Sequence, residues 1–182
     1  KQFDNAKQVL EQGKNQGFAE EKLNTLEAQL FSENQIQKVN SDNPPQEQLS
    51  RLIEYYQTER YFDAEKLAKS ITQQFPTHQF GWKVLGAVLK QTGRIIDSLT
   101  SMQKSVQLAP KDAAAHSNLG LTLQEMGRLH QAETSFKRAI ELKPEYALAY
   151  SNLGITQQEL GKLDEAEASY TQAIALEPDY AE

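Results

Sequence analysis

Two stretches of this chain, Ala113-Ala-Ala-His-Ser-Asn-Leu-Gly120 and Ala147-Leu-Ala-Tyr-Ser-Asn-Leu-Gly154, match each other at a distance of 34 residues. The same spacing separates four prolines, which are Pro76, Pro110, Pro144 and Pro178. A fixed period of this length is typical of stacked helical repeats, in which each unit buries its apolar face against its neighbours. The sequence therefore predicts an all-α repeat array.

The period divides the chain into an irregular segment and a regular one. Residues 1–43 contain a partial repeat-like helical segment and an irregular polar linker. Residues 44–182 contain four units, at 45–78, 79–112, 113–146 and 147–180, and the start of a further unit. We expect two helices in each unit. Because the chain begins inside one unit and stops at the start of another, we also expect it to be a piece of a longer protein.

Two sets of glycines recur with the same period. Gly93, Gly127 and Gly161 fall between the two helices of their units, where we expect a positive φ to end the first helix. Gly86, Gly120 and Gly154 lie on first helices, and their counterparts on the second helices are the small residues Ser98, Ala132 and Ala166. This pattern predicts a close approach of the two helices in each unit.

These residues resemble the tetratricopeptide repeat family, whose signature combines an aromatic residue, Leu-Gly, a small residue, an aromatic residue, Ala and Pro. The third and fourth units match nearly throughout. The second has Trp82 and Leu85-Gly86, but Met102 replaces the later aromatic residue and Ser105 the later alanine. The resemblance implies a right-handed superhelical α-solenoid of helix-turn-helix repeats, lined on its inner side by the first helices.

The same resemblance implies which residues face the concave groove of the solenoid. In this family the second, fifth, sixth, ninth, twelfth and thirteenth positions of each unit point inward, and in this chain most of these positions are polar. The candidate peptide-binding residues are Lys83, Gln91, Ser117, Asn118, Gln124, Glu125, Ser151, Asn152, Gln158 and Glu159. Lys83 stands where chaperone-binding relatives carry a carboxylate-clamp lysine, but Ala87 replaces the asparagine expected beside it.

Asn118 and Asn152 occupy equivalent positions in neighbouring units. A carboxamide both donates and accepts hydrogen bonds, so it can bind the backbone of an extended peptide whatever its side chains are. Equivalent helices lie roughly 10 Å apart, which is about three residues of an extended chain. The Ser-Asn-Leu-Gly context resembles the array of O-GlcNAc transferases, in which an asparagine ladder holds substrate polypeptide. Alternatively, the two asparagines are exposed consensus residues that contact water.

Composition excludes several other classes of protein. The chain has 182 residues, no cysteine and a net charge of −6, so we expect no nucleic-acid partner. No run of residues is apolar enough to span a membrane, and no targeting signal is present, which favours a cytoplasmic location. The three histidines do not fall at metal-ligand spacing, and no catalytic constellation is apparent. We therefore expect no metal, no cofactor and no enzymatic activity.

The sequence leaves three functions open. The first is a non-catalytic protein-interaction scaffold that binds extended peptides in its groove. The second is a structural module that associates with itself through the ends of the array, where Tyr170, Ile174 and Leu176 provide an apolar face. The third is a substrate-recognition arm for a glycosyl-, methyl- or sulfotransferase domain outside this chain.

Overall fold

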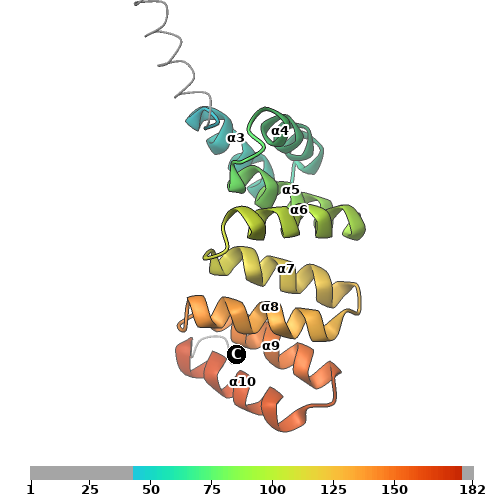
Figure 1. Cartoon of the computed structure of the whole chain (residues 1–182), viewed down its shortest axis with the longest axis vertical. Coiled ribbons are helices and arrows are strands. Elements are labelled where there is room, and N and C mark those ends of the chain that lie inside the picture. The colour runs from blue at the N-terminus through green and yellow to red at the C-terminus, as the bar shows by residue number, and fades with distance from the viewer. Residues whose placement is uncertain (1–42, 178–182) are drawn as a thin grey trace, which may run out of the picture. The chain divides into compact units, whose positions relative to one another are not determined.

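Eight helices follow one another along residues 43–177, the part of the chain that the computed structural model describes (Figure 1). They are α3 (Gln46–Gln57), α4 (Tyr61–Gln74), α5 (Gln79–Gln91), α6 (Ile95–Leu108), α7 (Ala113–Glu125), α8 (Leu129–Leu142), α9 (Ala147–Glu159) and α10 (Leu163–Leu176). Residues 43–177 contain no strand, and the predicted all-α helical-repeat solenoid is confirmed. None of these helices is long and apolar enough to cross a membrane. The helical segment and linker predicted before Asn43 lie outside the described residues.

The helices pack in the order in which they occur, each against the next. From α6 onward, every helix begins 34 residues after its counterpart in the preceding unit. Contacts also join α3 to α5, α5 to α7 and α7 to α9, whereas no such contacts join the second helices α4, α6, α8 and α10 to one another. The first helices therefore form a continuous layer, and their outward side forms one face of the array.

Glycine ends the first helix in three of the four units. Gly93, Gly127 and Gly161 have φ values of +75°, +69° and +75°, as the sequence predicted. In the first unit Glu59 takes this position with a φ of +57°, a conformation that costs a residue with a Cβ more than it costs glycine. This left-handed residue reverses the chain, so the second helix returns along the first.

The glycines inside the first helices make room for a large side chain. A Cβ at Gly120 would lie 2.7 Å from the ring of Phe136, and at Gly154 it would lie 2.7 Å from the ring of Tyr170. Met102 fills the same place over Gly86. The sequence analysis predicted that these glycines approach small residues on the second helices. One such approach is present at Gly86, whose carbonyl accepts a hydrogen bond of 2.8 Å from Ser98. The main reason for glycine, however, is the bulky side chain that lies on it.

A buried carboxylate joins two of the units. Glu133 on α8 is 6% exposed and accepts hydrogen bonds from Lys137 on its own helix and from Lys162 at the start of α10. Burial alone would raise the pKa of Glu133, but the hydrogen bonds and charges of the two lysines outweigh it and hold the pKa below its usual value. Glu65 makes the equivalent bridge to Lys69 and Arg94. The intervening unit has Leu99 at this position.

We predict that Glu133→Gln destabilises the fold in a pH-dependent way. Because the pKa of Glu133 is lowered in the folded state, the ionised carboxylate stabilises the fold at neutral pH, and this contribution is lost as the pH falls through the folded pKa. Urea unfolding followed by circular dichroism should show a loss of about 1 to 3 kcal/mol at neutral pH that shrinks below about pH 4. The control is Glu141→Gln, since that exposed carboxylate makes a surface pair that contributes little. A loss that is the same at every pH would contradict the charge-based explanation.

Candidate functional site

A hollow of about 400 Å³ lies on the face formed by the first helices. We call it the groove hollow. Nine of its ten lining residues come from α3, α5 and α7, and Met102 comes from α6. The lining residues are Tyr56, Lys83, Val84, Ala87, Lys90, Gln91, Met102, Ala114, Asn118 and Leu121.

Helical periodicity explains why these residues meet. Residues three and four apart lie on the same side of a helix, so five residues of α5 from Lys83 to Gln91 can share one face. Tyr56 on α3 holds the position in its unit that Lys90 holds in α5, and Ala114, Asn118 and Leu121 project from α7. The groove hollow therefore spans three consecutive units.

The charge of Lys83 is neutralised by the neighbouring unit. Lys83 Nζ lies 2.9 Å from Asp112 Oδ2, and both side chains are about three-quarters buried. Gln79 donates to the same oxygen, while Asp112 Oδ1 accepts from the backbone N–H of Ala115 and so caps α7. Burial alone would raise the pKa of Asp112, but Lys83 and the backbone hydrogen bonds lower it overall. Asp112 therefore remains ionised at neutral pH and holds Lys83 in place.

Two other polar groups of the groove hollow are not engaged in this way. No ion pair joins Lys90, which is half-buried, to another described residue. Thr122 donates to the backbone carbonyl of Asn118, but no hydrogen bond joins the Asn118 carboxamide to another residue of the described range. The groove hollow thus presents an ammonium group and a carboxamide that can bind a ligand.

Asn152 and Ser117 are more buried than the sequence predicted. Asn152 is 8% exposed, and its Nδ2 atom has no hydrogen-bond partner in the described part of the chain. Ser117 is fully buried, and its hydroxyl also lacks a partner there. At the position of Ser117, the preceding unit has Lys83, whose long side chain reaches the groove hollow. The serine side chain is too short to do so.

The remaining candidates are divided between other parts of the surface. Gln124 is half-buried, while Glu125, Gln158 and Glu159 are exposed. Gln158 accepts a hydrogen bond of 3.0 Å from the Tyr170 hydroxyl. None of these four side chains lines the groove hollow, which brings together Lys83, Gln91 and Asn118 from the predicted set.

Seven of the ten lining residues of the groove hollow were missing from the predicted set, and they are Tyr56, Val84, Ala87, Lys90, Met102, Ala114 and Leu121. Lys90 and Tyr56 occupy the twelfth position of their units, so the same offsets applied to the first two units would have identified them. Met102 lies on a second helix, and the offsets predict groove residues only on first helices. The described residues contain no group of three or more histidine, aspartate or glutamate side chains that could hold a metal ion.

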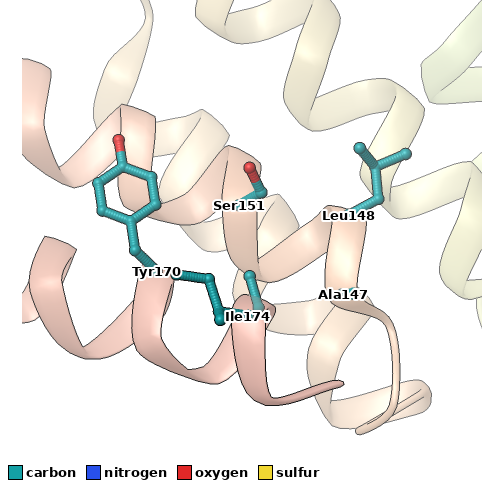
Figure 2. A pocket seen from close by; sticks show the side chains of 6 residues that line it. Ala147, Leu148, Ser151, Tyr170 and Ile174 are labelled. Atoms are coloured by element: carbon teal, nitrogen blue, oxygen red, sulfur yellow. The ribbon is translucent and has the colours of Figure 1, made fainter. Parts of the chain in front are cut away.

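A second hollow, which we call the end hollow, lies between α9 and α10 and measures about 230 Å³ (Figure 2). Its lining is mainly apolar and consists of Ala147, Leu148, Ser151, Tyr170, Ala173 and Ile174. In the preceding unit, the counterparts of Ser151, Tyr170 and Ala173 are fully buried, and α9 packs on that unit. The end hollow is therefore the kind of surface on which a further first helix packs within this array.

Comparison with known proteins identifies the repeat. Residues 111–177 match the model of the tetratricopeptide repeat family. Residues 111–177 are thus similar to tetratricopeptide repeats, in agreement with the resemblance seen in the sequence. No curated protein sequence matches the chain significantly.

Three solved structures illustrate the fold. A crystal structure of MamA has a TM-score of 0.69 and 22% identity, over 81% of this chain and 86% of that chain. YrrB, described as a TPR protein with an unusual peptide-binding site, has a TM-score of 0.64 and 26% identity, over 69% of this chain and 64% of its own. A variant of the Thermobaculum terrenum O-GlcNAc transferase has a TM-score of 0.60 and 27% identity; the match covers 62% of this chain and 22% of the transferase.

We predict that Asn152→Leu stabilises the isolated protein. A buried amide without a partner costs about 1 to 3 kcal/mol, and leucine has a similar shape without polar atoms. Urea unfolding should show a gain of about 1 kcal/mol for Asn152→Leu and little change for Asn118→Leu, whose amide is partly solvated. A loss of stability in Asn152→Leu would mean that Nδ2 already has a partner, such as an ordered water.

Proposed function

We propose that the array is a non-catalytic protein-interaction scaffold that binds extended peptide segments in the groove hollow. The observation that carries this proposal is the Asn118 carboxamide, which lines the groove hollow without a hydrogen bond to any described residue. A carboxamide in this state can donate to a peptide carbonyl and accept from a peptide N–H. Such bonds recognise the backbone, so the scaffold accepts peptides of different sequence.

Asn152 extends the proposed contact by one unit. Its Nδ2 atom has no hydrogen-bond partner among the described residues, and burying an amide in this state costs stability, a compromise that is common at binding positions. The first helices α7 and α9 contact each other, so the two asparagines belong to adjacent helices of one layer. Their expected spacing of roughly 10 Å suits an extended peptide of about three residues between contacts.

Two of the comparisons support the proposal. YrrB shares the fold and is described as having a peptide-binding site. The repeat region of an O-GlcNAc transferase also aligns with this chain, which keeps open the hypothesis of a substrate-recognition arm attached to a transferase. Stacked helical repeats generally offer extended binding surfaces and no catalytic chemistry of their own.

We predict that the double variant Asn118→Ala/Asn152→Ala loses affinity for extended peptides by about 1 to 3 kcal/mol. A library of unrelated peptides can be passed over the immobilised protein, and the dissociation constants of the bound peptides are then measured by fluorescence anisotropy. The weakening should be similar for dissimilar peptides, because the asparagines bind the backbone. Gln103→Ala, an exposed change on α6, is the matched control. Equal affinity of the double variant and the wild type would reject the proposed contact.

The end hollow supports a second candidate function, self-association. Leu148 and Ile174 on its rim are 44% and 47% exposed, although equivalent surfaces inside the array are covered by the next unit. Full burial of an exposed side chain of this size contributes about 1.5 to 3 kcal/mol. Covering the exposed part of Leu148 and Ile174 therefore contributes roughly half of that for each. A second copy of the chain that packs on this surface would form an end-to-end dimer.

We predict that Ile174→Glu abolishes any such dimer, because the charged side chain would have to be buried in the contact. Light scattering over a range of protein concentrations measures the mass of the wild type and of the variant. Ile96→Glu is the control, since Ile96 is an exposed isoleucine on another helix. A wild-type protein that stays monomeric at the highest concentration would eliminate this candidate.

A further inference from the structure

We infer that the groove hollow selects extended peptides that carry a carboxylate, and that Lys90 binds this group. The inference rests on the proposed function and names the class of peptide that the scaffold prefers. It starts from the charge of the lining residues. The whole chain has a net charge of −6, yet the groove hollow is lined by two lysines and by no carboxylate. Its local charge is therefore opposite to that of the protein as a whole.

The two lysines do not play the same part. Lys83 forms an ion pair with Asp112 at 2.9 Å, so its charge is already balanced inside the protein. Lys90 lies seven residues further along α5, roughly 10 Å away along the helix axis, and is paired with no described residue. A half-buried ammonium group that faces a hollow binds an anion more strongly than an exposed one does, because solvent screens it less. Lys90 is thus the anion-binding residue.

The other lining residues restrict the shape of the ligand. Ala87 lies between the two lysines on α5 and leaves room for a peptide backbone to cross the helix. Asn118 lies on the neighbouring helix α7 and presents the carboxamide that we assign to the peptide backbone. A single available lysine suits one carboxylate, whereas a nucleic-acid backbone would require a dense row of basic residues. The ligand that fits is a peptide with an acidic side chain or a free C-terminus near its backbone contact.

The test uses acetylated peptides about eight residues long, which is enough to span the three units of the groove hollow in an extended conformation. The first set of peptides shares one neutral sequence, and each peptide carries a single glutamate at a different position. For each of them, a control peptide carries glutamine at the same position. In the second set the neutral sequence ends in a free carboxylate or in an amide. Fluorescence anisotropy measures the dissociation constants at low and high salt for the wild type, Lys90→Gln, Lys83→Gln and Asp112→Asn, each checked by circular dichroism.

We predict that the wild type binds the best glutamate peptide about tenfold more tightly than its glutamine partner at low salt, and less selectively at high salt. Lys90→Gln should abolish this preference, so that the glutamate and glutamine peptides bind it with similar affinity, whereas Lys83→Gln should keep the preference. Asp112→Asn should increase it, because asparagine still caps α7 while Lys83 becomes available.

The possible failures can be told apart. If glutamate and glutamine peptides bind equally, or if the preference survives in Lys90→Gln, the inference is wrong while the proposed peptide binding stands. If the free C-terminus alone is preferred, and this preference depends on Lys90, the carboxylate comes from the chain end. If no peptide of either set binds, both the inference and the proposed function are rejected.

Discussion

The packing of a large side chain on a glycine is the contact on which the rest of this array depends. Phe136 lies on Gly120 and Tyr170 on Gly154, so close that a single Cβ would overlap the ring. This contact fixes the distance between the two helices of a unit. Since the second, third and fourth units use the same contact, with Met102 on Gly86 in the second, each presents a similar surface to the next, and these units stack with one period. The layer of first helices, and with it the groove hollow, is a consequence of that repetition.

The polar contacts between units act on this framework in different ways. Glu133 and Glu65 each form an ion pair between a second helix and the start of the second helix in the next unit. The ion pair of Asp112 and Lys83 instead connects two first helices beside the groove hollow. The latter pair has a functional consequence. By balancing the charge of Lys83 and capping α7 at the same time, Asp112 leaves Lys90 as the lysine of the groove hollow that is free to bind an anion. A residue that stabilises the stack thereby determines the charge offered to a ligand.

The most regular part of the array provides only three of the ten residues that line the groove hollow. The third and fourth units match the repeat signature best, but most lining residues belong to the second unit, where Lys83, Val84 and Met102 depart from its neighbours. In the regular units two polar side chains of the same face are covered, since Ser117 is fully buried and Asn152 nearly so. Shared residues thus maintain the fold, while the residues in which one unit differs from the others create a site that could distinguish between ligands.

The sequence predicts those features of the structure that depend on residues close together in the chain. The period of 34 residues, the helix pairs, and the turns at Gly93, Gly127 and Gly161 follow from residues close together in the chain, and these predictions are confirmed. The offsets along a helix also indicated the face to which Lys83, Gln91 and Asn118 belong. Whether a side chain on that face reaches solvent, however, depends on its length and on what the neighbouring helix places over it. The sequence by itself therefore determined the repeat and its faces, whereas the tertiary structure decided that Ser117 and Asn152 are buried, that Lys83 is neutralised and that Lys90 is available, because each of these results from contacts between units.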